Sequence, residues 1–215
     1  MNADDINLWR WAGILILAGG IFFWIGAFTL PYKQWMTKDV KEYLTIIGTH
    51  KTNWHIIHAF FLVGVIVNFF GITLLTDALK QQNQNMLPQL AYSAFIIGTI
   101  LWIIDIAFRV VYTTWAAKQF VEFNEIQNFY VTLRTWSSSL FSVYMVLAYL
   151  ATGFIGTALL QSQVLPNWIG WFCIVFGYAG SVLYIVRFQL FDPPLMVHLP
   201  YMILGIAILV KLKAG

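Results

Sequence analysis

Two histidines lie three residues apart in the segment TNWHIIHAFF (residues 52–61), where a long apolar run begins. This spacing places His55 and His58 on one face of a helix. Imidazole nitrogens bind haem iron or zinc, carry protons, or form the polar rim of a membrane helix. A third imidazole, His198, is expected near the same membrane boundary.

Three interpretations of these histidines remain open. In the first, they lie near the interface and bond to water, lipid headgroups or Asp105. In the second, His58 or His198 is the axial ligand of haem or another porphyrin. His55 and His58 cannot sandwich one haem, because they share a helical face. In the third, His55, His58 and His198 bind the metal of a zinc-dependent hydrolase, with Asp105 adding an oxygen ligand.

Asp105 and Arg109 lie four residues apart in an apolar segment, the spacing of an ion pair on one helix. A carboxylate in hydrocarbon is costly, and a neighbouring guanidinium lowers that cost. At ~1.5 Å per residue, Asp105 lies about 18 Å from the end of its predicted span. The pair either orients its helix or belongs to a polar half-membrane cavity, whose other expected members are His55, Arg134, Arg187 and Asp192.

Membrane helices must position these side chains. The chain has 215 residues, 60% hydrophobic and 10% charged, which is too little charge for a soluble domain. A span needs about 20 apolar residues, and backbone in lipid must be helical. We predict an all-α polytopic membrane helix bundle that forms a single membrane domain over residues 1–215. Its six spans are 8–30, 54–77, 88–117, 135–161, 167–187 and 194–213.

Two further sequence patterns predict how helices pack. Val40, Leu44 and Ile47 recur at helical spacing, which predicts a short amphipathic helix on the membrane surface between the first two spans. Small residues form rows that let helices approach closely. These rows are Gly64, Asn68 and Gly71 on the second span, and Ser138 and Ser142 on the fourth.

Charge predicts the orientation and the class of partner. More Lys and Arg residues fall on the side of the first, third and fifth links, so both termini are expected outside the cytoplasm. The first apolar run is long enough to span and follows two acids, so we expect a retained helix. The chain has no basic run typical of nucleic-acid binding. The expected partners are the lipid bilayer and a larger membrane complex or a second copy of the chain.

Two runs carry a family resemblance. Residues 39–75 begin with DVKEYLTIIGTHKTNWHIIHAFF, and residues 153–186 contain LPNWIGW. Together they resemble a broad group of small bacterial six-helix membrane proteins classed as a domain of unknown function. His58 matches the early histidine of that pattern and Trp168 its interfacial tryptophan. The resemblance implies the fold and a bacterial inner membrane, and it implies no activity.

Three functions fit these observations. The first is a non-catalytic accessory subunit or lipophilic-ligand-binding protein, which we favour because the chain has no phosphate loop, nucleophile elbow or dinucleotide fingerprint. The second is a redox protein that binds haem or a pigment through His58 and His198. The third is a small transporter or metal-dependent membrane hydrolase, with Asp105 as the proton or cation site.

Overall fold

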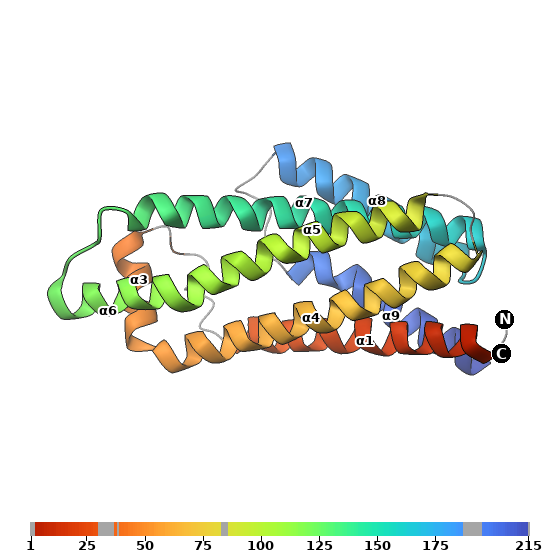
Figure 1. The fold of residues 1–215 in the computed structure, drawn as a ribbon, viewed down its shortest axis with the longest axis horizontal. Coiled ribbons are helices and arrows are strands. Elements are labelled where there is room, and N and C mark those ends of the chain that lie inside the picture. The colour runs from red at the N-terminus through yellow and green to blue at the C-terminus, as the bar shows by residue number, and fades with distance from the viewer. Residues whose placement is uncertain (1–2, 30–36, 38, 83–85, 187–194, 215) are drawn as a thin grey trace.

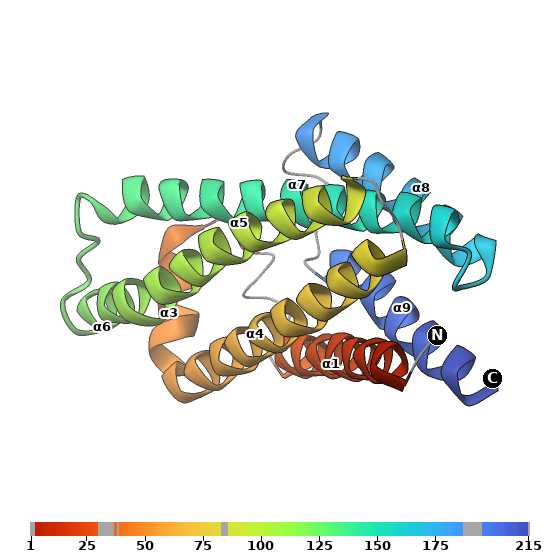
Figure 2. The same ribbon diagram turned by 45° about the vertical axis from the view of Figure 1, so that its right-hand side comes forward.

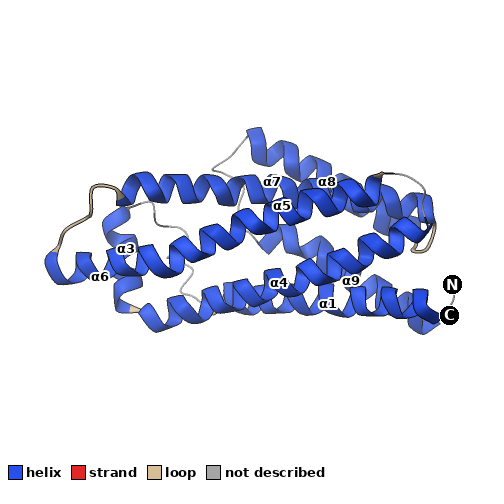
Figure 3. Ribbon diagram, in the orientation of Figure 1, coloured by secondary structure: helices blue, strands red, loops and turns tan. Residues whose placement is uncertain are grey.

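The computed structural model describes residues 3–29, 37, 39–82, 86–186 and 195–214. Within these ranges the chain consists of helices and short connections, without a strand (Figure 3). Six of the helices there are long and apolar enough to cross a membrane. The predicted all-α polytopic bundle is therefore confirmed.

The helices follow the predicted spans, with the first four of them longer than expected. They are α1 (Ala3–Phe28), α3 (Val40–Thr49), α4 (Lys51–Gln82), α5 (Leu87–Phe108), the π-helix η1 (Arg109–Thr113), α6 (Thr114–Phe123), α7 (Tyr130–Ser162), α8 (Asn167–Val186) and α9 (Leu195–Ala214). The third span is one continuous helix made of α5, η1 and α6, which we call helix three. Its 37 residues extend about 55 Å, well beyond the roughly 30 Å of a hydrocarbon core.

The spans pack as two groups of three. α1 lies along α4 and α9, and α7 lies along α5 and α8, while α4 and α5 join the groups (Figures 1 and 2). Small residues allow the closest approach. A Cβ atom added at Gly71 would lie 2.7 Å from the backbone nitrogen of Ile16, and one at Gly64 would lie 3.0 Å from the carbonyl oxygen of Gly19. The predicted packing role of the Gly64 row is confirmed.

One end of the molecule extends beyond α1, α8 and α9 (Figure 1). We call this end the lobe. It comprises α3, η1, α6 and the first two turns of α4 and α7. Its buried core includes Leu44, Ile47, Trp54, Ala117 and Tyr130. The expected amphipathic helix is confirmed as α3, but its apolar face packs against α6 and the lobe core. Burial within the protein therefore accounts for its pattern, and its place at the membrane surface stays a prediction.

Candidate functional site

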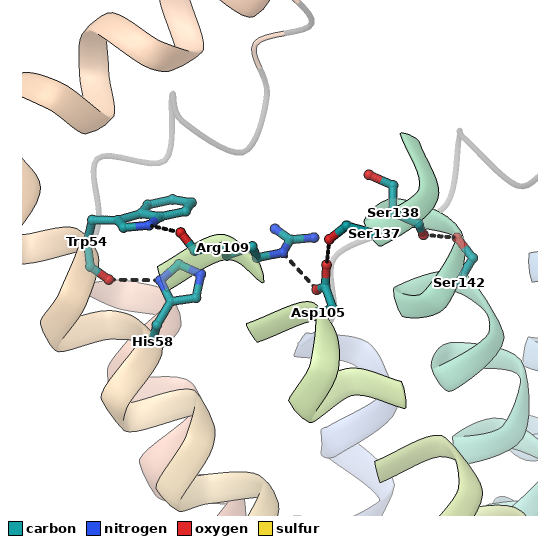
Figure 4. A network of polar contacts seen from close by, with 7 residues as sticks. All are labelled: Trp54, His58, Asp105, Arg109, Ser137, Ser138 and Ser142. Carbon is teal, nitrogen blue, oxygen red and sulfur yellow. Dashed lines mark hydrogen bonds and ion pairs between the residues drawn. The ribbon is translucent and has the colours of Figure 1, made fainter. Parts of the chain in front are cut away.

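Asp105 is the centre of a buried polar network where the lobe joins the bundle (Figure 4). Its carboxylate is fully buried, and both of its oxygens accept hydrogen bonds. Arg109 Nε donates to Oδ2 at 2.7 Å, and the Ser137 hydroxyl donates to Oδ1. The i to i+4 spacing on helix three aligns the first contact, and the packing of α7 along α5 supplies the second. These bonds give both carboxylate oxygens a partner in a position where an unpaired charge would be costly.

The second feature of the network is the π-helical turn that begins at Arg109. The indole Nε1 of Trp54 donates to the Arg109 carbonyl oxygen at 3.0 Å, so α4 binds helix three where its hydrogen-bond register changes. His58 Nδ1 lies 2.8 Å from the carbonyl oxygen of Trp54. A carbonyl only accepts, so the proton of neutral His58 is on Nδ1. π-Helical turns within α-helices occur frequently at functional sites.

Two arginines lie one helical turn outward from the contact between Asp105 and Ser137. Arg109 follows Asp105 by four residues on helix three, and Arg134 precedes Ser137 by three on α7. The guanidinium carbon of Arg134 lies 4.3 Å from the ring centroid of Tyr43 on α3. Burial raises the pKa of Tyr43, and the positive charges of Arg109 and Arg134 oppose that rise. Among the described residues, Arg109 and Arg134 therefore place two positive charges around Tyr43, and Asp105 supplies one negative charge.

His198 lies deeper, in a layer of rings from four helices. Its ring stacks on Phe23 with centroids 3.8 Å apart, and Trp102 stacks on Tyr144 at 4.5 Å. Tyr144 Oη lies 3.1 Å from His198 Nε2, and Asn68 Nδ2 lies 3.3 Å from His198 Nδ1. We call Phe23, Trp102, Tyr144 and His198 the ring layer. Both imidazole nitrogens are thus within hydrogen-bond distance of protein groups.

The ring layer gives the level of the polar network within the bundle. The described part of α1 reaches Phe28, about 7.5 Å beyond this layer, and that of α9 starts at Leu195, about 4.5 Å beyond it. On helix three, Asp105 lies about 4.5 Å beyond the layer and Arg109 about 10.5 Å. Asp105 is therefore level with the described start of α9, and Arg109 lies farther toward the lobe. The depth of about 18 Å expected from the sequence stays a prediction.

The structure brings together some of the residues predicted to form the site and separates others. Asp105, Arg109, Arg134, His55 and His58 lie at the lobe end, where His55 Nε2 is 3.4 Å from Thr114 Oγ1. Around Asp105 the structure shows direct contacts between side chains, and the predicted cavity stays a prediction. Arg187 and Asp192 lie outside the described residues.

The histidines of the predicted haem and zinc sites lie at different levels of the bundle. The rings of Phe61 and Phe23 lie in series between His58 and His198. His58 meets Phe61 edge-on, whereas Phe23 stacks on both Phe61 and His198. Among the residues that the structure describes, no group of three or more His, Cys, Asp or Glu side chains is arranged to bind a metal ion. The described geometry therefore does not assemble His55, His58 and His198 as one set, and haem binding stays a prediction.

Sequence reasoning missed Ser137. It singled out Ser138 and Ser142, whereas Ser142 Oγ donates to the Ser138 carbonyl within α7 and Ser137 faces Asp105. A heptad spacing in the sequence could have identified this serine. Ser137 lies seven residues from both Tyr130 and Tyr144, and all three side chains are buried. Residues seven apart lie close to the same helical face, so this periodicity identifies the serine that faces the core.

Comparison with known proteins agrees with the fold. The family described as a domain of unknown function (DUF4386) matches residues 11–211. No curated protein and no solved structure matches the chain. The matched range includes all six spans almost completely, so the resemblance inferred from the sequence is confirmed.

Proposed function

The chain belongs to the DUF4386 family, a domain of unknown function, and we propose that it is a non-catalytic membrane protein that binds an anionic lipophilic ligand. The observation that carries this proposal is the imbalance of charge around Asp105. One buried carboxylate is bonded to Arg109, while Arg134 adds a second guanidinium over Tyr43. An anionic headgroup would balance that charge.

The depth of the arginines supports a lipid-like ligand. Arg109 lies beyond the end of α1, about 10.5 Å from the ring layer, at the level expected for phosphate or carboxylate headgroups. Its side chain is 18% exposed, so it is accessible from the surface. Guanidinium groups bind carboxylate and phosphate through paired hydrogen bonds. The acyl chains would lie against the apolar surface of the bundle.

Tyr43 supports the same class of ligand. A tyrosine phenol is uncharged at neutral pH, and burial raises the pKa of Tyr43 further, so it adds no negative charge that would repel an anion. Since the shift is upward from the ordinary tyrosine pKa of about 10, this neutrality holds at and below that pH. Affinity for an anionic ligand should therefore not fall through ionisation of Tyr43 between pH 6 and about 9.

Removing the second guanidinium tests the proposal. Arg134→Gln leaves the Asp105–Arg109 pair intact and removes the guanidinium over Tyr43. A basic residue near a membrane surface contributes about 1 kcal/mol to binding of anionic lipid, so we expect about fivefold weaker binding. Native mass spectrometry of the purified protein with added phosphatidylglycerol measures this affinity.

Lys118→Gln is the matched control. Lys118 is also in the lobe and also positive, but it is 60% exposed and lies 3.7 Å from Glu122. Its removal should leave phosphatidylglycerol binding within about twofold of wild type, because an exposed pair contributes little. Equal effects of the two substitutions, or no effect of Arg134→Gln, would contradict a specific site.

The orientation and assembly of the protein follow from the same proposal. We propose that the lobe faces the cytoplasm of a bacterial inner membrane, because the sequence has more Lys and Arg on that side. The cytoplasmic leaflet is the anionic one, which matches the excess positive charge at Arg109 and Arg134. A role as an accessory subunit of a larger membrane complex, or as a homo-oligomer, would be compatible with a bound lipid.

A further inference from the structure

A second candidate site lies on the lobe, on the outer side of helix three. It is a surface hollow of about 580 Å³ between helix three and the connection to α7. Three aromatic side chains, one carboxylate and two amides line it: Tyr112, Trp115, Phe129, Glu125, Gln127 and Asn128. The volume is within the range of about 300–1,000 Å³ typical of small-molecule sites.

The chemistry of the hollow favours a cation. Its lining contains Glu125 and no Lys or Arg. The rings of Tyr112 and Trp115 lie with centroids 5.4 Å apart, and the Trp115 side chain is 43% exposed. Aromatic faces attract alkylated ammonium groups through the ring quadrupole, and a carboxylate adds a full negative charge. This combination distinguishes the hollow from the arginine-rich network around Asp105.

The hollow is formed by backbone and ring contacts. Asn124 adopts the left-handed conformation (φ 55°) and ends α6, with its N–H bonded to the Phe120 carbonyl oxygen at 2.8 Å. This turn reverses the chain toward α7. Tyr112 stacks on the buried ring of Tyr130 at 6.1 Å, which fixes one wall. A wall held in this way reduces the ordering cost of binding.

The level of the hollow matches the polar layer of a membrane. Tyr112 lies about 38 Å along helix three from Leu87, which exceeds the roughly 30 Å hydrocarbon core. The exposed rings of Trp115 and Phe129 are of the kind that lies at this interface. From these observations we propose that the hollow binds an alkylammonium group, carried by a zwitterionic lipid headgroup or by a free amine.

The proposal is tested with tetramethylammonium chloride and the full chain in mild detergent. Saturation-transfer NMR should show transfer from the protein to the methyl groups of the probe. Trp115→Leu and Glu125→Gln should each weaken binding about two- to fivefold, the range expected for an exposed cation–π or charge contact. Trp115→Phe keeps an aromatic face and should retain more affinity than Trp115→Leu.

Trp136→Leu is the matched control, because Trp136 is a similarly exposed tryptophan (51%) outside the lining of the hollow. It should bind the probe as wild type does. Absence of transfer from wild type to the probe, or equal binding by wild type and Glu125→Gln, would overturn the proposal. The comparison of wild type with Glu125→Gln decides even when Trp115→Leu unfolds, since Glu125 is exposed and its substitution should preserve the fold.

Lipid nanodiscs distinguish the two sources of the ammonium group. If the natural ligand is a lipid, phosphatidylethanolamine in the nanodisc should suppress the probe signal relative to pure phosphatidylglycerol. If it is a free amine, the two nanodiscs should give equal signals, with Glu125→Gln still reducing them. Either result supports an alkylammonium site, and loss of the Glu125 effect in both nanodiscs would contradict it.

Discussion

The carboxylate of Asp105 links three segments that are far apart in the sequence. Its hydrogen bonds from Arg109 and Ser137 connect helix three with α7. The carbonyl oxygen of Arg109 accepts a hydrogen bond from the indole of Trp54, which adds α4. Such a network stabilises the junction between bundle and lobe only while every member is bonded. Its energetic and ligand-binding roles can therefore be separated by substitutions that break different members.

Asp105→Asn should lower the free energy of unfolding by about 2–4 kcal/mol, because it leaves the largely buried Arg109 without its counter-charge. Thermal unfolding in detergent measures the change. Asp77→Asn is the control, since Asp77 pairs with Lys80 on the exposed end of α4 at 3.2 Å. That substitution should cost about 0–1 kcal/mol. A similar loss in both variants would mean that the Asp105 network has no special role in stability.

The histidines lead to a spectroscopic prediction. We expect protein purified from a haem-sufficient host to lack a Soret band, because His198 Nε2 and Nδ1 already face Tyr144 and Asn68. Absorption spectra of the oxidised and reduced protein check this. A Soret band that disappears in His58→Ala or His198→Ala would instead support the haem-binding alternative, in which His58 Nδ1–H bonded to a carbonyl orients the ligand.

At the scale of elements, the close contact of α1 with α4 depends on glycines, which have no side chain to separate the helices. Without a hydrophobic driving force in lipid, helices associate through close packing, which small residues permit. Gly71 lies against the backbone of α1, whereas Gly98 on α5 has more room, with its nearest neighbour 3.3 Å from an added Cβ atom. The two glycines therefore differ in whether a neighbouring helix must move.

Gly71→Ala should destabilise the protein by about 1–3 kcal/mol, because the new methyl group would lie 2.7 Å from Ile16 N and would push α1 away. Gly98→Ala should be close to neutral, because higher helix propensity of up to about 1 kcal/mol offsets minor crowding. Unfolding of both variants in one detergent measures the difference. The packing account is wrong if Gly98→Ala is the more destabilised of the two.

The whole molecule is polarised along the membrane normal. The N- and C-terminal ends of the described chain lie at one end, and the lobe lies at the other (Figure 1). The network around Asp105 and the aromatic hollow both belong to the lobe end. Its orientation therefore determines which leaflet and which solution supply a ligand.

Cysteine labelling in intact cells determines that orientation. In a Cys173→Ser background, which removes the buried free cysteine, Lys213→Cys should react with a membrane-impermeant maleimide. Glu122→Cys, on the lobe, should react only after the membrane is permeabilised, because the positive-inside rule predicts a cytoplasmic lobe. The reverse pattern would place the arginines in the opposite leaflet and contradict the predicted topology.

The sequence by itself determined the features that depend on local spacing. Apolar length predicted six spans, the i to i+4 spacing predicted the pairing of Asp105 with Arg109, and small residues predicted the face of α4 that meets α1. These features need no knowledge of which helices are neighbours. They are confirmed because backbone in lipid must be helical and because a helix has a constant period.

Only the tertiary structure decided which groups meet across helices. Ser137 lies 32 residues from Asp105, and His198 lies 130 residues from Asn68. No local period relates residues so distant, so their contacts depend on the packing of α7 along α5 and of α9 along α1. The level of Asp105 relative to its neighbours was decided in the same way. The length of helix three alone does not say what lies beside Asp105, whereas the packing of Trp102 with Phe23 of α1 and His198 of α9 places it one turn from the ring layer.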